Sequence, residues 1–222
     1  MELKDLSPTL AGVDFPPFAS ALAAGGQVKG LAVPNGAGLS RKTLDELQEF
    51  VKRYGATALA WIKLGDETTS SLLKALGNEV VSHMAEIAGA KKGDAVLIVS
   101  GKPKIVAASL GALRNEVAKR EKLIPENIYA PLWVTDFPMF EYHEEDGRFY
   151  PMHHPFTSPR EEDMDKLETD PAAVRAKAYD LVLNGVELGS GSIRIHSREM
   201  QRRIFDVLGY SDEEARSKFG FL

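Results

Sequence analysis

The chain has 222 residues, 44% of them hydrophobic and 27% charged, with 27 Lys and Arg against 32 Asp and Glu and a formal net charge of -5. These proportions are typical of a globular protein and exclude a disordered or collagen-like chain. The acidic balance excludes a generally basic nucleic-acid-binding protein, although not a local RNA-binding patch. Cysteine is absent, which excludes disulfides, zinc–thiolate sites and a cysteine nucleophile.

The sequence contains no recognisable targeting or membrane segment. Residues 1–10 lack a basic region followed by an apolar one, and the longest apolar runs, such as 95–99, are far shorter than the roughly 18 residues of a membrane-spanning helix. We therefore expect a protein without a signal peptide and without membrane contact, located in the cytoplasm.

The first half of the chain alternates short apolar strands with amphipathic helices. Pro16-Pro17 predicts a turn, because a proline pair cannot lie inside a helix. Ser40 can cap a helix in which apolar residues from Leu44 to Tyr54 recur at helical spacing. The predicted strands are 28–33, 58–64 and 95–99, and the predicted helices are 41–54, 70–88 and 105–122. This alternation predicts a compact α/β domain, which we place at residues 1–125.

The second half, residues 126–222, is predicted to be antiparallel sheet with helices packed on it. The charged stretch 158–178 is predicted to be helical, with Asp170-Pro171 starting a second short helix, and Ser197 and Ser211 can each cap a later helix. The predicted strands are 132–135, 139–142, 149–150, 179–183, 186–188 and 192–196. The chain is therefore assigned to the α/β (α+β) class, as two domains.

The first candidate site is the proline-flanked stretch 151–159, which contains His153 and His154. Two adjacent histidines project to opposite sides of an extended chain, so they rarely chelate one metal together. A loop defined by prolines suits a gate over a ligand. The alternative is a surface loop whose histidines form only local hydrogen bonds.

The second candidate site is the glycine-containing stretch 184–194. Gly189 and Gly191 let a backbone approach a ligand closely, Arg194 can bind a carboxylate or phosphate through two parallel hydrogen bonds, and Glu187 can accept from a ribose hydroxyl or hold magnesium. We expect Glu187 and Arg194 to face one pocket, with a turn or bulge at the glycines between them. The alternative is a bulged strand with one surface ion pair. The stretch does not open a helix, so it is not a Rossmann or P-loop motif.

The remaining motifs favour structural roles. The aromatic residues around Pro138 in the stretch 133–141 are typical of core packing, and His83 lies in an apolar-rich helix. Basic clusters at 102–104 and 114–122 are typical of a solvated helix face.

Four strings in the second half carry a resemblance to a known family: WVTDFPMFE (133–141), MHHPFTSP (152–159), AYDLVLNGVELGSGSIRIH (178–196) and EEARSKFGFL (213–222). Together they resemble bacterial-type aspartyl-tRNA synthetases of class II. Residues from about 10 to 124 resemble the GAD domain inserted in this family. Residues from about 130 to 222 resemble the part of the catalytic domain that follows the insertion, which is an antiparallel sheet, as predicted above for the second half.

The resemblance implies substrates and residue roles. The family activates aspartate with ATP, accompanied by Mg²⁺, and transfers it to tRNA, and the full-length parent is expected to be a homodimer. On this resemblance His153 and His154 belong to the loop that closes over aspartate, Arg194 binds the side-chain carboxylate of aspartate, and Glu187 binds ATP and its magnesium. No catalytic residue is assigned. An arginine matched to a carboxylate would also reject neutral asparagine.

The sequence departs from the family pattern in two ways. Ser190 stands between Gly189 and Gly191, where the family has a glycine. The anticodon-binding OB-fold and the three class II motifs are missing, which predicts a fragment that is inactive alone.

The alternative function is a non-catalytic module, built on the GAD-like domain, that binds tRNA or a protein partner. A third alternative is an amidotransferase-related adaptor. Such an adaptor would contain neither the MHHPFTSP nor the NGVELGSGS string, and both are present in this chain.

Overall fold

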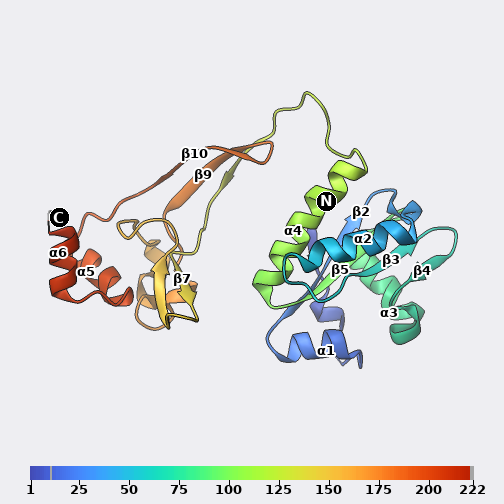
Figure 1. Cartoon of the computed structure of the whole chain (residues 1–222), viewed down its shortest axis with the longest axis horizontal. Coiled ribbons are helices and arrows are strands. Elements are labelled where there is room, and N and C mark those ends of the chain that lie inside the picture. Colours follow the sequence, from blue (N-terminus) through green and yellow to red (C-terminus); the bar gives the residue numbers. More distant parts are fainter. Residues whose placement is uncertain (11, 221–222) are drawn as a thin grey trace. The chain divides into compact units, whose positions relative to one another are not determined.

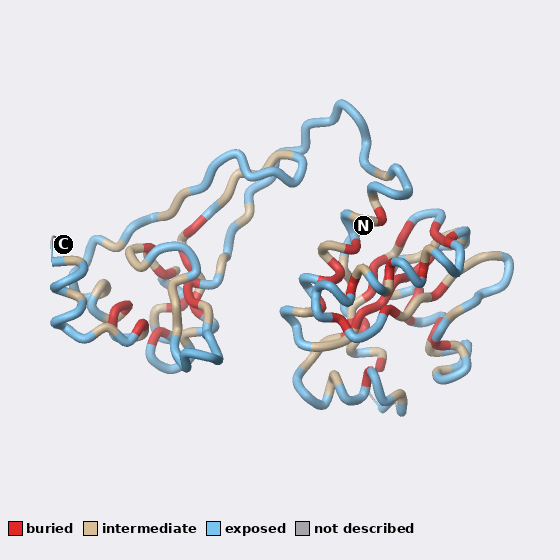
Figure 2. The backbone as a smooth tube through the Cα atoms, in the orientation of Figure 1, coloured by how far each residue is buried: buried red, intermediate tan, exposed pale blue. Residues whose placement is uncertain are grey.

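The computed structural model describes residues 1–10 and 12–220 and divides into two compact units, the N-terminal unit (1–126) and the C-terminal unit (127–222). Each unit has buried residues of its own (Figure 2). Phe221 and Leu222, the last two residues of the EEARSKFGFL string, lie outside the described residues. None of the helices formed by the described residues is long and apolar enough to cross a membrane.

The N-terminal unit is built on a five-stranded antiparallel sheet (Figure 1). In spatial order its strands are β1 (Leu3–Asp5), β2 (Gln27–Val33), β5 (Ala95–Gly101), β3 (Ala60–Leu64) and β4 (Thr68–Ser70). The central strand β5 is buried from Ala95 to Val99. Because helices cover both faces of this strand, its sequence is a continuous apolar run rather than an alternating pattern.

Helices on the two faces of this sheet form two apolar cores. The helices are α1 (Pro16–Ala23), α2 (Arg41–Lys52), α3 (Leu73–Ile87) and α4 (Pro103–Arg120). One core joins α2 and α4 to the sheet through fully buried residues such as Leu47 and Leu110, and the other joins α1 and α3 through Phe18 and Met84. Ser40 caps α2 by accepting a hydrogen bond from the backbone N–H of Thr43, as its position in the sequence predicts.

The proline pair Pro16-Pro17 begins α1, so the prediction of a turn at this point is wrong. The first N–H groups of a helix have no partner within the helix, and a proline therefore loses no hydrogen bond in the first turn. The three longer predicted helices are present as α2, α3 and α4, with ends shifted by a few residues.

The C-terminal unit contains two small antiparallel sheets. The first has the spatial order β10 (Val186–Ser192), β9 (Ala178–Leu183) and β6 (Pro131–Val134), and the second is the hairpin of β7 (Phe140–His143) and β8 (Arg148–Pro151). The helices α5 (Arg198–Val207) and α6 (Asp212–Phe219) follow, capped by Ser197 and Ser211 as the sequence predicts. The predicted fold class, α/β (α+β) with antiparallel sheet and flanking helices, is confirmed.

The charged stretch 158–178 forms less helix than its composition predicts. It contains only two short 3-10 helices, η3 (Glu161–Lys166) and η4 (Pro171–Ala173). Residues 158–160 and 175–177 instead form backbone hydrogen bonds with distant segments, and these bonds compete with local helix formation. The predicted strand at 192–196 is likewise only partly formed, because β10 ends at Ser192 and Arg194 forms an isolated bridge.

Candidate ligand-binding site

Three segments that lie far apart in the sequence meet beside Arg194. The backbone N–H of Ser158 donates to the carbonyl oxygen of Ile193 over 2.8 Å, and that of Lys177 donates to the carbonyl oxygen of Ser158 over 2.8 Å. The backbone N–H of Ile193 completes the cycle by donating to Lys177 over 2.9 Å. These bonds join residues 156–160, 175–177 and 193–195, a set that we call the three-segment junction. The junction holds the C-terminal end of the proline-flanked stretch 151–159, which we call the histidine loop, against Arg194.

His154 and Arg194 come together at this junction. Thr157 forms a backbone bridge with Arg194, and the N–H of Phe156 donates to Nδ1 of His154 over 3.2 Å. Partial burial lowers the pKa of His154, and the positive charge of Arg194 lowers it further. The imidazole is therefore neutral near pH 7, with Nδ1 accepting and Nε2 carrying the proton.

His153 makes a different contact from its neighbour. Its ring packs edge-on against Phe137, with the ring centroids 4.7 Å apart. The ring of His154 instead lies 4.8 Å from that of Phe156. The two adjacent histidines thus have separate partners, in keeping with their opposite directions in an extended chain.

Arg194 lies at an open cavity of about 380 Å³ in the C-terminal unit. Two other cations at this cavity are neutralised, because Lys177 pairs with Glu161 and Arg203 pairs with Glu168. Arg194 is exposed and forms no ion pair with any residue in the ranges 1–10 and 12–220. Its guanidinium is therefore free to bind an anionic ligand in the fork geometry that suits a carboxylate.

Glu187 lies on β10 next to a β-bulge. Glu187 pairs with Val182 and Gly189 pairs with Leu181, so Leu188 is an extra residue with no partner opposite it. Side chains alternate between the two faces of a strand, and one extra residue reverses that alternation. The bulge therefore changes which residues of β10 share a face with Glu187.

The bulge places Glu187 on the same face as Ser190 and Ser192, and the next position on that face is Arg194. Without the bulge, two residues seven positions apart would face opposite sides. The chain between them is the bulged strand β10 as far as Ser192 rather than a turn, so at the rise of an extended chain Glu187 and Arg194 lie about 20 Å apart. The two side chains thus share a face without converging on one point.

Gly191 has a packing role that the sequence alone does not reveal. A Cβ atom at this position would lie 2.5 Å from the hydroxyl oxygen of Tyr179 on the neighbouring strand. Tyr179 also packs edge-on against Trp133, with the ring centroids 5.7 Å apart. A side chain at 191 would therefore displace the ring of Tyr179 from this aromatic pair, whereas a Cβ at Gly189 would meet no atom within 4 Å.

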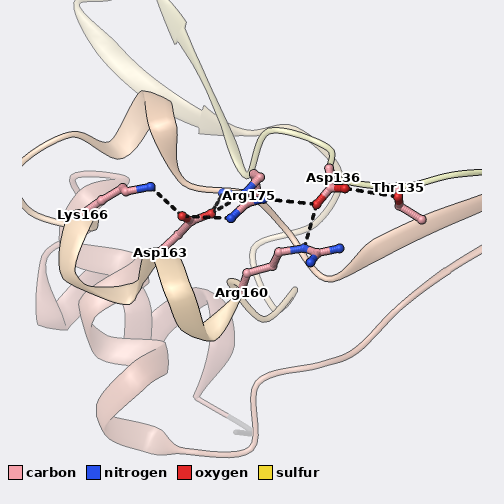
Figure 3. Close-up of polar contacts among 6 residues, drawn as sticks. All are labelled: Thr135, Asp136, Arg160, Asp163, Lys166 and Arg175. Atoms are coloured by element: carbon pink, nitrogen blue, oxygen red, sulfur yellow. Dashed lines mark hydrogen bonds and ion pairs between the residues drawn. The ribbon is translucent and has the colours of Figure 1, made fainter.

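A network of charged side chains joins Asp136 to Arg160, which directly follows the histidine loop, and to Arg175 (Figure 3). Asp163 is fully buried and accepts hydrogen bonds from Lys166 and from the side chain and backbone N–H of Arg175. Asp136, from the WVTDFPMFE string, forms ion pairs with Arg160 at 2.9 Å and with Arg175 at 3.6 Å. Asp163 cannot be singled out from the sequence alone, since it is one of many acidic residues in a charged stretch.

The described residues, 1–10 and 12–220, contain no group of three or more His, Asp or Glu side chains that could hold a metal ion. Glu187 thus offers a single carboxylate. Proteins commonly bind Mg²⁺ through one or two carboxylates together with the phosphates of a nucleotide. Glu187 fits that use and does not fit a metal cage built from protein ligands alone.

The comparisons with known proteins agree on one family. The family model of the GAD domain matches residues 18–110. The chain is 51% identical to "Aspartate--tRNA ligase" of Clostridium botulinum (strain Alaska E43 / Type E3), covering 100% of the chain and 37% of that protein. It is 48% identical to "Aspartate--tRNA(Asp/Asn) ligase" of Natranaerobius thermophilus and 51% identical to the protein of that name from Caldanaerobacter subterraneus subsp. tengcongensis, covering 100% of the chain and 38% of each.

These relatives are more than twice as long as the chain, which spans 37% to 38% of their length. Relatives named with and without Asp/Asn both occur at 51% identity to the chain. The family resemblance predicted from the sequence is confirmed. The chain contains a GAD domain and corresponds along its whole length to a segment of bacterial aspartate–tRNA ligases.

Proposed function

We propose that the C-terminal unit supplies part of the aspartate and ATP site of an aspartate–tRNA ligase. The observation that carries this proposal is the free guanidinium of Arg194 at an open cavity whose other cations are already paired. An unpaired arginine beside a neutral histidine suits one carboxylate of a small ligand. The N-terminal unit is the GAD domain of the same ligase.

Arg194 recognises the side-chain carboxylate of aspartate. The guanidinium is always charged and can donate two parallel N–H bonds to the two carboxylate oxygens. Asparagine would place an NH₂ group against one of these donors and leave the cation without a counter-charge, so the site rejects it. His154, held neutral beside Arg194, has Nε2–H available as a further donor to the same carboxylate.

His153 has a separate place in this proposal. It belongs to the loop beside the aspartate site and packs on Phe137, so its position depends on the WVTDFPMFE string. The loop is tied down from Phe156 onward by the three-segment junction. Any closure over aspartate therefore involves residues 151–155.

Glu187 contacts ATP. It lies on the same face as Arg194 but about a strand's length away, which suits two substrates bound end to end better than one small ligand held at both ends. Magnesium bound with the nucleotide neutralises phosphate charge, and the single carboxylate of Glu187 would hold that ion or a ribose hydroxyl. Glu187 thereby orients the nucleotide toward the carboxylate that Arg194 does not bind.

The complete ligase is proposed to act on aspartate, ATP and tRNA as a cytoplasmic homodimer. The 222-residue chain alone should not activate aspartate, because most of the length of its relatives lies outside it. Each preorganised charged donor missing from such a site typically costs on the order of 3 kcal/mol of transition-state stabilisation.

The test is aspartate-dependent exchange of pyrophosphate into ATP, measured on the full-length ligase and on the 222-residue chain. We expect exchange by the ligase with aspartate, none with asparagine, and none by the chain. Exchange by the ligase that depends on another amino acid would overturn the proposal. Binding of tRNA without any exchange would support the non-catalytic module instead.

A further inference from the structure

Asp163 is a buried carboxylate that contacts no candidate ligand residue directly. Its side chain is almost completely buried, and its two oxygens accept hydrogen bonds from Nζ of Lys166 at 2.6 Å, Nε of Arg175 at 2.7 Å and the backbone N–H of Arg175 at 3.1 Å. These donors hold the pKa of Asp163 far below its ordinary value, so the carboxylate stays ionised. A buried charge of this kind is tolerated only because it is paired and fully hydrogen-bonded.

Arg175, which Asp163 holds in place, is itself bonded to the end of the histidine loop. Its carbonyl oxygen accepts from the backbone N–H of Arg160 over 2.9 Å, and its backbone bridges to Pro138. Asp136 lies between the guanidinium groups of Arg160 and Arg175 (Figure 3). Asp163 therefore fixes the backbone of Arg175, and Arg175 fixes the point at which the histidine loop ends.

The same backbone continues into the three-segment junction. Lys177, two residues after Arg175, hydrogen-bonds Ser158 and Ile193, and Ile193 is the neighbour of Arg194. A shift of the segment 175–177 would thus move residues 156–160, which follow His154, and residues 193–195, which include Arg194. Asp163 contacts neither His154 nor Arg194, so it can affect them only by fixing the position of the backbone between them.

We propose that Asp163 is a positioning residue for aspartate recognition, acting through Arg175 and the three-segment junction on Arg194 and His154. This inference rests on the proposed function of Arg194. Replacing Asp163 by Asn would put an NH₂ group among donors and leave the fork of Arg175 with one acceptor oxygen. The segment 175–177 would then relax, and the guanidinium of Arg194 would move relative to bound aspartate.

A purely structural role predicts a different outcome from a positioning role. Loss of folded protein lowers the active concentration and leaves both Michaelis constants unchanged. Misplacement of Arg194 raises the Michaelis constant for aspartate and spares that for ATP, because Glu187 lies about a strand's length away on β10. The two constants, measured in one variant, therefore separate the two roles.

The first test compares Asp163→Asn with Asp165→Asn in the full-length ligase, using pyrophosphate exchange. Asp165 is a matched control, since it lies two residues away, carries the same charge and is exposed. We expect Asp163→Asn to raise the Michaelis constant for aspartate about tenfold or more, up to the roughly 100-fold cost of a misplacement near 1 Å, and to change that for ATP less than twofold. Asp165→Asn should match the wild type.

The second test uses the 222-residue chain and needs no catalysis. Titration of the histidine C–H signals by NMR should show the pKa of His154 moving back toward its ordinary value in Asp163→Asn. Arg175→Lys, which keeps the charge and loses the fork, should shift it in the same direction if Asp163→Asn does not fold.

The outcomes separate this inference from the proposed function. An active wild-type ligase whose Asp163→Asn variant keeps its aspartate Michaelis constant within twofold would overturn the positioning role alone. An unmoved His154 titration in the folded variant would do the same. A wild-type ligase without aspartate-dependent exchange would overturn the proposed function, while the NMR result would still decide whether Asp163 positions His154.

Discussion

The ring of Tyr179 on β9 occupies the space that a side chain at Gly191 on β10 would need, with its hydroxyl oxygen 2.5 Å from the position of a Cβ atom there. Gly191→Ala should therefore push Tyr179 away from Trp133. The loss of this aromatic pair should lower the free energy of unfolding of the C-terminal unit by about 0.5–1.5 kcal/mol. Urea unfolding followed by Trp133 fluorescence, in a Trp61→Phe background, measures the change.

Two variants control this prediction. Gly189→Ala, at a position with open space around it, should cost less than Gly191→Ala. In a Tyr179→Ala background, Gly191→Ala should have almost no effect, because the clash is gone. Equal costs with and without Tyr179 would show that packing against this ring is not the reason for the glycine.

The C-terminal unit should lose stability as the pH falls below neutrality, in part through His154. Burial and the charge of Arg194 put the folded-state pKa of His154 below the ordinary value of 6.5. Protonation therefore favours the unfolded chain, so the contribution is complete above about pH 7 and declines as the pH falls through 6.5 toward the folded-state pKa. Urea unfolding at pH 7.5 and 5.5 should show this loss, and His154→Gln should reduce it. An identical pH dependence in both proteins would contradict the assignment.

Limited proteolysis should separate the two units. The segment between α4 and β6 is exposed, with Tyr129 80% and Ile128 54% accessible, and the boundary between the units falls after Glu126. Brief chymotrypsin digestion should therefore cut after Tyr129 and leave the N-terminal unit intact. Early cleavage within α3 or α4, detected by mass spectrometry, would show that this unit does not fold on its own.

Glu187→Gln in the full-length ligase should act mainly on ATP. The substitution keeps the shape of the side chain and removes the charge that would hold magnesium or align a ribose hydroxyl. We expect the Michaelis constant for ATP to rise and that for aspartate to stay within about twofold, since a strand's length separates Glu187 from Arg194. Pyrophosphate exchange with each substrate varied in turn provides both constants. A change in the Michaelis constant for aspartate alone would contradict the roles proposed for Glu187 and Arg194.

The elements that could be predicted from the sequence are those set by local pattern. The apolar spacing of Leu44, Leu47 and Val51 and the cap at Ser40 are sufficient for α2, and a continuous apolar run is sufficient for β5. The prediction of a turn at Pro16-Pro17 is wrong because a proline pair fits the first turn of a helix as well as it fits a loop.

The remaining features depend on partners that the local sequence does not identify. The stretch 158–178 is helical by composition, but its backbone bonds to residues 193–195 override that preference. Asp163 cannot be told from neighbouring acidic residues until Arg175 is seen to fold onto it. The spacing of Glu187 and Arg194 suggested one shared pocket, and only the bulge at Leu188 shows that they share a face at a distance.

The central claim is that Arg194 binds the side-chain carboxylate of aspartate, and Arg194→Lys in the full-length ligase tests it most directly. Lysine keeps the charge and loses the fork, so kcat/KM for aspartate should fall by the equivalent of roughly 2–5 kcal/mol, the range for breaking a desolvated charge pair, while the Michaelis constant for ATP stays unchanged. Arg198→Lys, four residues further on and exposed, is the matched control and should behave as wild type. An Arg194→Lys ligase with a raised Michaelis constant for ATP and unaltered use of aspartate would contradict the account.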